Sequence, residues 1–525
     1  MRNFLLSFIS GILLAISFPK IDFEYGAWIA LVPLFLILAS VDSKRAFAFS
    51  YVTGVVFFTL TIYWISTVST LGMVLLVLYM SLYIALFGVL TNCLFWRLKL
   101  PLALIAPPIW VLCEFIRGHL LTGFPWALLG YSQYKQIALI QSASFISVYG
   151  ISCLIVLINA SIVDIWLFFK NKKRCRMFLI GPVLSVIAVT VFLIYGNIIT
   201  SAEKIGCVEE GIKVGIVQPN ITQEEKTEGI YSARERVLNI HLNLSEELLK
   251  FNPDIIIWPE TALTYVDNYD GELISKLKNF AKHNNLYLLT GICYMVSSTG
   301  EYYNGAFLIE PEGAMRQRYD KIHLVPFGEY IPLKSLFPFL SKVVPIGNFA
   351  HGKEYTVLNF CKKSKLDLNQ KIKFACTICF ENIFPDFNRQ FVKNGARFLV
   401  NLTNDSWFGK SPAPYQHMSM SVFRAVENHI PVIFNANTGV SCFIDEFGRI
   451  NNKISNGNDD IFVAGTGFAD IYINDGKTFY TKYGNLFVVF NIIWLVILTG
   501  IYIFVRITPC FVFCPRSSVG RAHAW

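Results

Sequence analysis

The sequence predicts an α-helical membrane domain of about eight spans joined to an external α/β domain. The chain is 54% hydrophobic and only 15% charged, with a mean hydropathy of +0.49, which is unusually apolar for a soluble protein. Apolar runs of about 20 residues, long enough to cross a bilayer, fill the first 200 residues and recur near the end. Between them, polar residues appear, and short β-rich runs alternate with helical ones.

The apolar runs give the predicted spans, at about 4–18, 26–41, 46–66, 72–96, 101–117, 138–169, 177–199 and 485–505. The first has Arg2 before its apolar core but lacks a small-residue cleavage site, so we expect an uncleaved span. The sixth is too long for one upright span, and we expect a short interfacial helix and then a span, broken near Gly150. The predicted organisation is a seven-span domain at 1–200, an external domain at 201–484, an eighth span at 485–506 and a tail at 507–525.

Basic residues in the short loops indicate the orientation. Alternate loops carry Arg2, then the pairs at 44–45 and 97–99, then a cluster at 170–176, whereas the opposite loops carry only Lys20, Arg117 and Lys135. Because cytoplasmic loops are enriched in Lys and Arg, both termini are expected in the cytoplasm and the 201–484 segment outside. One span more or fewer would reverse this orientation.

Composition also weighs against other classes of protein. The formal net charge is +9, but no basic stripe interleaved with aromatic residues suggests nucleic acid. The spacing of the twelve Cys does not fit a zinc site. Charges inside the spans are sparse, mainly Glu114, Arg117 and Asp164, whereas transporters usually have more. Glu114 and Arg117 share a helix face, and a structural ion pair is their simplest role.

The external segment has the alternation typical of a layered α/β domain. We expect helices at about 232–249, 272–283 and 416–428. Strands are expected at 212–218, 255–258, 287–290, 306–309, 373–378, 397–402, 432–435 and 441–444. The aromatic loop at 120–133 lies on the same side as this segment, where either an interfacial aromatic belt or a lipid-facing lip would fit.

Three strand-end motifs carry the candidate chemistry. Cys379 follows an apolar, β-branched run, where a thiol is accessible to a substrate. A thiol becomes a nucleophile when another group takes its proton and a third stabilises the charge on the acyl oxygen. Glu260, at the end of the run IIIWPE, and Lys321, in the stretch YDKIHLVPFGEY, can supply these two functions. A Glu-Lys-Cys acyl-transfer site is therefore our hypothesis.

Several motifs in the external segment resemble the nitrilase (carbon–nitrogen hydrolase) superfamily. They read WPETA at 258–262, YDKIHLVPFGEY at 319–330, CFE at 379–381 and NLTNDSWFG at 401–409. With the spans, and with TGFPW at 122–126 and GYSQ at 130–133, nearly the full chain resembles the apolipoprotein N-acyltransferase family. The resemblance implies a nitrilase-like αββα sandwich and no metal or organic cofactor.

The resemblance also implies the site and its reaction. Glu260 would be the proton acceptor, Lys321 would stabilise the oxyanion and Cys379 would be the nucleophile. Four other residues are expected to support the site: Glu329, Phe380, Glu381 and Trp407. In that family an acyl chain moves from a membrane phospholipid to the Cys as a thioester. It then moves to the N-terminal S-diacylglyceryl cysteine of an apolipoprotein.

The implied setting is the bacterial inner membrane, with the catalytic domain on the periplasmic side. The lipid bilayer, a phospholipid donor and diacylglyceryl apolipoprotein acceptors would be the partners, and nothing demands more than a monomer. Two positions depart from the family pattern. Phe380 stands where many members have Tyr, and 220–226 lacks the Trp that many members carry there.

Each assignment has an alternative. Cys379 could be a packed small residue or could pair with Cys376, although an extended strand places these thiols poorly for a disulfide. His323 is expected to be structural, and Trp407 either contacts lipid or lies in a core. A membrane-anchored amidase or nitrilase that hydrolyses a C–N bond would use the same thioester. A transporter or receptor is a further alternative, against which the complete triad argues.

Overall fold

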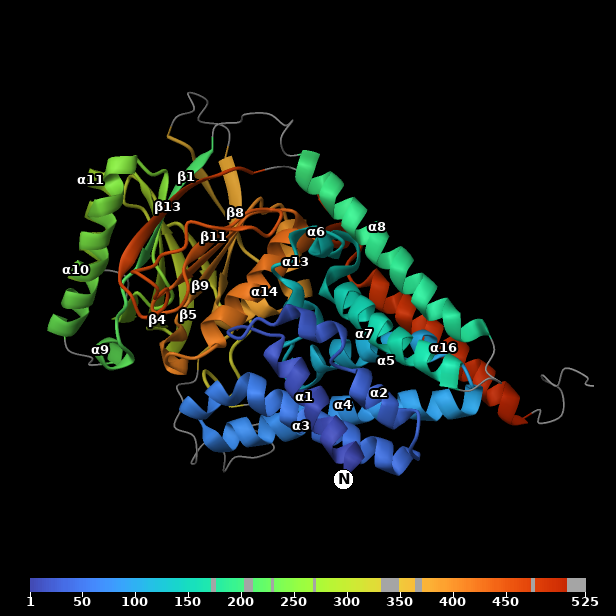
Figure 1. The fold of residues 1–525 in the computed structure, drawn as a ribbon. Coiled ribbons are helices and arrows are strands. Elements are labelled where there is room, and N and C mark those ends of the chain that lie inside the picture. Colours follow the sequence, from blue (N-terminus) through green and yellow to red (C-terminus); the bar gives the residue numbers. More distant parts are fainter. Residues whose placement is uncertain are drawn as a thin grey trace, which may run out of the picture.

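A computed structural model of the protein describes residues 1–170, 176–202, 211–227, 231–267, 271–331, 349–363, 371–473 and 477–507. The basic residues at 172–174 and the tail from 508 onward therefore lie outside the described residues. Figure 1 shows two parts, a helical domain (residues 1–202 and 486–507) and a layered α/β part, the sandwich domain (residues 211–473).

Every apolar run of the sequence contains a helix. The helices of the helical domain are α1 (Arg2–Ile16), α2 (Val32–Leu38), α3 (Ser43–Ile62), α4 (Thr70–Leu98), α5 (Leu102–Arg117), α6 (Ile137–Ile140), α7 (Ala143–Lys170), α8 (Ile180–Ala202) and α16 (Leu486–Ile507). Among the described residues, five helical stretches are long and apolar enough to cross a membrane: Ser43–Thr67, Thr70–Leu98, Ala143–Lys170, Arg176–Ser201 and Leu486–Phe504. This supports a membrane domain, and the count of eight spans stays a prediction.

The three remaining runs form shorter helices. Arg2–Ile16 has 15 residues and Leu102–Arg117 has 16. The run at 26–41 forms a 3₁₀ turn, η1 (Glu24–Trp28), followed by the seven-residue α2. The sixth run divides into α6 and α7, and α7 bends at Ser147, whose φ of 56° and ψ of −178° are not helical. This bend lies close to the predicted break at Gly150.

The sandwich domain consists of two β-sheets. One sheet has the order β13-β1-β2-β4-β5-β6, with β3 paired to β4, and the other has the order β12-β11-β10-β9-β8-β7. The strands of the first are β1 (Ile212–Gln218), β2 (Ile255–Ile257), β3 (Leu263–Asp267), β4 (Tyr287–Val296), β5 (Glu301–Ile309), β6 (Gln317–Asp320) and β13 (Gly465–Ile471). Those of the second are β7 (Val357–Cys361), β8 (Lys371–Ile378), β9 (Leu399–Thr403), β10 (Val432–Ala436), β11 (Cys442–Ile444) and β12 (Ile450–Asn451).

Both sheets have parallel centres and antiparallel edges. β1, β2 and β4 pair in parallel, as do β8, β9 and β10. Figure 1 shows helices α10 (Tyr231–Leu248) and α11 (Glu272–His283) on the outer face of the first sheet. Helices α13 (Pro385–Lys393) and α14 (Ala413–Asn428) lie on the other side, between the second sheet and the helical domain. The predicted αββα arrangement is therefore confirmed.

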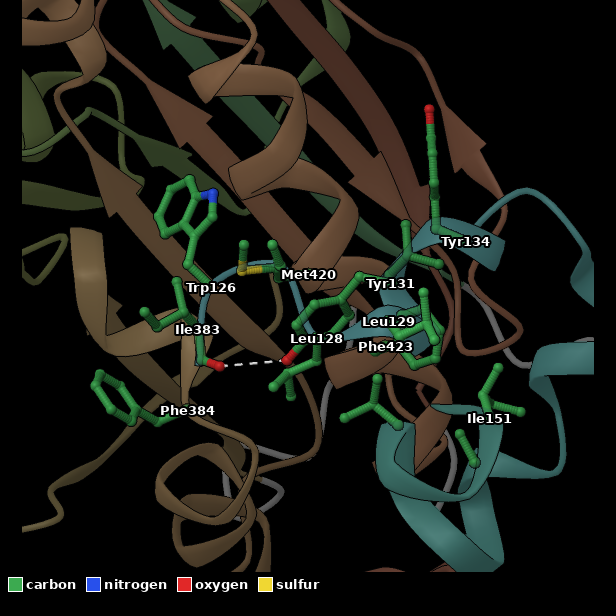
Figure 2. Packing of buried hydrophobic residues seen from close by; sticks show 14 of the residues in the cluster. Trp126, Leu128, Leu129, Tyr131, Tyr134, Ile151, Ile383, Phe384, Met420 and Phe423 are labelled. Carbon is green, nitrogen blue, oxygen red and sulfur yellow. Dashed lines mark hydrogen bonds between the residues drawn. The ribbon is translucent and has the colours of Figure 1, made fainter. Parts of the chain in front are cut away.

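The two domains share a continuous packed interface. A single cluster of buried apolar side chains extends from α1 to the strands of the second sheet. Figure 2 shows the centre of this interface, where Trp126 and Tyr131 of the 120–133 loop pack beside Ile383 and Phe423 of the sandwich domain. The Tyr131 hydroxyl donates a hydrogen bond to the Ile383 carbonyl at 3.4 Å. The aromatic loop is thus mostly an interdomain contact rather than a belt.

Candidate active site

The nucleophile candidate lies at a sharp turn. β8 ends at Ile378, and Cys379 begins the 3₁₀ turn η8 (Cys379–Ile383) with a φ of 52°. A positive φ is uncommon for a non-glycine residue, and such strained positions occur frequently at active sites. Cys379 follows the carboxyl end of the strand, where the sequence placed it, but the residue is half-buried rather than exposed. Cys376 and Cys379 are both free thiols.

The other two triad candidates meet in a buried cluster of charges. Lys321 directly follows β6, and its Nζ lies 2.9 Å from Glu329 Oε1 and 3.6 Å from Glu260 Oε1. Glu260 follows β2 and is also buried. Asn304, on β5, donates to Glu260 Oε1 at 2.8 Å and to Glu329 Oε1 at 3.3 Å. The cation therefore lies between two carboxylates that share one amide donor.

Burial and charge shift the protonation of this cluster. Burial raises the pKa of the Cys379 thiol, Glu260 raises it further, and Lys321 opposes them. Burial also raises the pKa of Glu260, and Lys321 opposes that shift. Burial lowers the pKa of Lys321, but Glu329 and Glu260 outweigh burial and raise it above its ordinary value. Lys321 therefore stays a cation. The Glu260 carboxylate is more basic than an ordinary glutamate, as a proton acceptor needs to be.

Glu381 connects two parts of the site. Its fully buried carboxylate accepts a hydrogen bond from the Tyr319 hydroxyl at 2.7 Å and from the N–H groups of Ile322, His323 and Ile378 at 2.7, 2.9 and 2.7 Å. These donors flank Lys321 on one side and Cys379 on the other. Burial raises the pKa of Glu381 to about 7. Glu381 thus supports the site by fixing the two turns relative to each other.

The remaining sequence candidates lie around this centre. Phe380 packs against Phe124 of the helical domain, with ring centroids 6.0 Å apart. Trp407 is 52% exposed, which excludes the buried-core alternative, and its carbonyl accepts a hydrogen bond from Thr67 at 3.0 Å. His323 packs on Phe384 at 4.1 Å, and burial lowers its pKa to about 4. A structural role for His323 fits these contacts.

Sequence reasoning missed two polar residues of the cluster. Asn304 had no signal beyond its place near a strand. Lys226, on α9 (Gln223–Thr227), is buried, and its Nζ donates to the Glu260 carbonyl at 3.2 Å. Burial lowers the pKa of Lys226 to about 7. The sequence singled out 220–226 only for its missing Trp, and Lys226, eight residues beyond the end of β1, had no further signal.

Glu114 and Arg117 bind the aromatic loop. Glu114 Oε1 accepts a hydrogen bond from the Leu129 N–H at 2.7 Å, and Arg117 donates to the carbonyls of Phe124 and Trp126 at 3.2 and 2.6 Å. Both side chains therefore hold the main chain of the loop that reaches the sandwich domain. These contacts fit the structural role that we expected, but they are hydrogen bonds to main-chain atoms of the loop rather than the expected ion pair alone.

Comparisons with known proteins agree with these two domains. Residues 10–161 match the apolipoprotein N-acyltransferase N-terminal domain, and residues 213–472 match the carbon-nitrogen hydrolase family. Apolipoprotein N-acyltransferase from Geobacter metallireducens is 36% identical, over 93% of this chain and 92% of that protein. The Rickettsia prowazekii protein of the same name is 31% identical over 93% and 96%, and the Pasteurella multocida protein is 30% identical over 92% of each.

Proposed function

The chain belongs to the apolipoprotein N-acyltransferase family and is an acyltransferase, and we propose that its reaction proceeds through a thioester on Cys379. The proposed donor is a membrane phospholipid. The proposed acceptor is the α-amino group of the S-diacylglyceryl cysteine at the start of a lipoprotein. The observation that carries this proposal is the buried cluster of Glu260, Lys321 and Glu329 beside a strained cysteine at the interface with an apolar helical domain.

In the first half-reaction, Glu260 takes the proton of the Cys379 thiol, and the thiolate attacks the ester carbonyl of the phospholipid. The C–S bond forms, and the Lys321 ammonium stabilises the negative oxygen of the tetrahedral intermediate. The C–O bond to glycerol then breaks, and the proton on Glu260 passes to the leaving alkoxide. The products are a lysophospholipid and the acyl-enzyme.

In the second half-reaction, Glu260 takes a proton from the ammonium group of the acceptor. The free amine attacks the thioester, a C–N bond forms, and the C–S bond breaks after Lys321 has again stabilised the oxyanion. Glu260 releases this first proton to water, then takes the second proton from the attacking nitrogen as the amide forms and passes it to the leaving sulfur, so each transfer releases one proton to the solvent. One copy of the chain supplies all three groups, so the proposed reaction needs only a monomer.

Glu329 has a supporting role in this proposal. Its Oε1 accepts from Lys321, and its Oε2 accepts from the Val325 N–H at 2.8 Å. The carboxylate thereby holds the ammonium toward the site while Glu260 remains available for proton transfer. This arrangement uses two carboxylates for two tasks, one for orientation and one for chemistry.

Exposed apolar side chains beside the site support a lipid donor. Trp407 is 52% exposed, and Leu120 and Leu121 of the aromatic loop are 51% and 65% exposed. Side chains of this kind favour the apolar boundary of a bilayer. We therefore propose that the sandwich domain rests on the periplasmic face of the inner membrane, with both termini in the cytoplasm.

The test uses purified protein in detergent with a phospholipid radiolabelled in its acyl chain. Wild-type protein should acquire label that neutral hydroxylamine removes, and Cys379→Ala should not. Cys361→Ala, which removes another partly buried thiol, is the matched control and should be labelled like wild type. Adding a diacylglyceryl peptide should then move the label to the peptide. Absence of label on folded wild-type protein would contradict a phospholipid donor, and release of the acyl group to water alone would favour an amidase.

A further inference from the structure

We propose that Gln416 and His417, adjacent residues of α14, are positioning residues that make the geometry of the Cys379 turn depend on docking of the helical domain. The inference rests on the proposed function of Cys379 and adds how that site is held. Neither residue belongs to the motifs that identified the site. Both are buried, 3% and 2% exposed, at the interface between the two domains.

His417 holds the main chain of the nucleophile. Its Nε2 lies 3.1 Å from the carbonyl oxygen of Cys379, and its Nδ1 lies 3.3 Å from Asp405 Oδ1. Because a carbonyl oxygen can only accept, Nε2 is the donor in the first contact. Asp405 is itself buried and begins η9 (Asp405–Phe408), just after β9. The imidazole therefore connects the end of β9 to the strained turn after β8.

Gln416 holds the helical domain. Its Nε2 donates to the carbonyls of Pro19 and Thr61 at 2.9 and 3.1 Å. Its Oε1 accepts from the indole N–H groups of Trp64 and Trp126 at 3.2 and 2.8 Å. Both donors and both acceptor positions of the amide are therefore used. The partners come from three separate segments of the helical domain, so a single side chain fixes α14 against all of them.

Trp126 links the two residues. Its indole N–H binds Gln416, while its ring lies 5.6 Å from the imidazole of His417. Phe124, two residues earlier in the same loop, packs on Phe380, which directly follows Cys379. The aromatic loop of the helical domain thus contacts the nucleophile turn directly through Phe124 and indirectly through Trp126 and His417. Loss of the Gln416 contacts should move this loop and, through it, the thiol.

The experiment measures the reactivity of Cys379 in full-length protein in detergent, by two independent readouts. The first is the rate of alkylation by iodoacetamide, followed at Cys379 by fragmentation mass spectrometry, with Cys361 as the internal reference thiol. The second is hydroxylamine-sensitive labelling from phospholipid. The variants are His417→Ala, His417→Gln and Gln416→Leu. The matched control is Gln141→Leu, which removes another interdomain hydrogen bond, from Gln141 Nε2 to the Phe447 carbonyl at 2.8 Å.

We expect His417→Ala to slow both reactions at Cys379 by about 100-fold, since a misplacement of about 1 Å costs a factor of that order. His417→Gln, which keeps a donor at the Nε2 position, should recover most of this loss. Gln416→Leu should slow both reactions by about 10-fold, and Gln141→Leu should leave them unchanged. Alkylation of Cys361 should be unchanged in every variant.

Wild-type alkylation of Cys379 in His417→Ala would overturn the proposal, as would equal losses in His417→Ala and His417→Gln. If His417→Ala does not fold, the proposal is tested by comparing Gln416→Leu with Gln141→Leu. Equal rates of Cys379 alkylation in these two variants would overturn the proposal. Alkylation requires no lipid. A wild-type protein that takes no label from phospholipid would therefore contradict the proposed function, while the alkylation rates would still decide the role of His417.

Discussion

The candidate active-site cluster (Glu260, Lys321 and Glu329) and the domain interface both bury charged side chains, but the charges have different partners in the two regions. In the cluster, Lys321 contacts carboxylates of its own domain, Glu260 and Glu329. At the interface, Arg424 pairs with Glu427 at 2.8 Å, and the two bind main-chain atoms of neighbouring segments. Glu427 accepts from the Ser147 hydroxyl at 2.6 Å and the Val148 N–H at 3.0 Å, at the bend in α7.

These different partners indicate the role of each group of charges. The Glu427 carboxylate binds the Val148 N–H, the first after the bend, where a negative charge stabilises the start of a helix. Arg424 donates to the Ile383 carbonyl at 3.1 Å, at the end of the nucleophile turn. The Arg424–Glu427 pair thus connects the main chain of the helical domain, at Val148, to the main chain of the sandwich domain, at Ile383. The cluster ions lie close enough to the Cys379 thiol to shift its pKa, and in the proposed reaction Glu260 exchanges a proton with it.

The largest expected effect comes from breaking the cluster. Lys321→Met removes the cation that stabilises the oxyanion in the proposed reaction and should lower acyl transfer by about 10²–10³-fold. It also leaves two buried carboxylates without their partner and should reduce the free energy of unfolding by about 3–5 kcal/mol. Labelling by phospholipid and denaturant unfolding in detergent measure these quantities. Lys135→Met removes a lysine that is 45% exposed and paired with Asp22, and should change neither.

Breaking the interface should mainly affect stability. Glu427→Leu leaves Arg424 buried without its partner and the N–H of Val148 unsatisfied, so the free energy of unfolding should fall by about 3–5 kcal/mol. Adding Arg424→Met should restore part of this loss, because the unpaired charge is then removed. Glu272→Gln, at an exposed ion pair, should have an effect below about 1 kcal/mol. Equal stability of Glu427→Leu and wild type would refute the connecting role of this pair.

Lys226 combines features of both regions. It is a buried lysine beside the cluster, but its Nζ binds a main-chain carbonyl and a hydroxyl rather than a carboxylate. Its pKa of about 7 lies below the ordinary 10.5, so the unfolded chain binds more protons between these values. Its contribution to stability should therefore rise with pH from about 7 to 10.5. Relative to Lys226→Met, wild-type protein should gain roughly 2–4 kcal/mol across this range. Unfolding curves of both proteins at pH 7 and 10 test this, and parallel pH profiles would contradict it.

Trp407 should give the smallest effect on stability. Because its side chain is 52% exposed, Trp407→Ala should change the free energy of unfolding by less than about 0.5 kcal/mol. If the indole contacts lipid, labelling from phospholipid should fall by about 3- to 10-fold. Phe251→Ala, which truncates a 42% exposed ring on the outer side of the sandwich, should leave labelling unchanged.

The sequence predicted the charged cluster well because each of its principal residues lies within three residues of the end of a strand. β2, β6 and β8 lead to Glu260, Lys321 and Cys379, and the carboxyl ends of strands in an α/β domain are where side chains converge. The buried strands at the centres of both sheets were predicted because each is a short, continuous apolar run. The expected strands did not include β3, nor the four edge strands β6, β7, β12 and β13. A polar residue in β7 and Gly465 and Gly467 in β13 interrupt the apolar pattern.

The interface could not be predicted in this way. Every residue of α14 except Tyr415 is buried, including Gln416, His417, Arg424 and Glu427, although a helix with so many polar residues normally faces water on one side. Gln416 and Glu427 bind main-chain atoms, indoles and a hydroxyl of the other domain, which are distant in sequence. His417 and Arg424 bind carbonyl and carboxylate oxygens of their own domain. Hydrophobic periodicity contains no signal for such contacts. The catalytic roles and the domain boundaries stay predictions until they are measured.

One feature of the sandwich bears on how the chain is made. β13 pairs along its whole length with β1, from Ile212 opposite Ile471 to Gln218 opposite Gly465. During synthesis β1 therefore emerges long before its neighbour, and one edge of the first sheet stays open until nearly the entire chain has left the ribosome. Only α16 follows. The sandwich domain should accordingly reach its protease-resistant form late in biogenesis, close to insertion of the last helix, and chains truncated before residue 465 should be cleared by quality control.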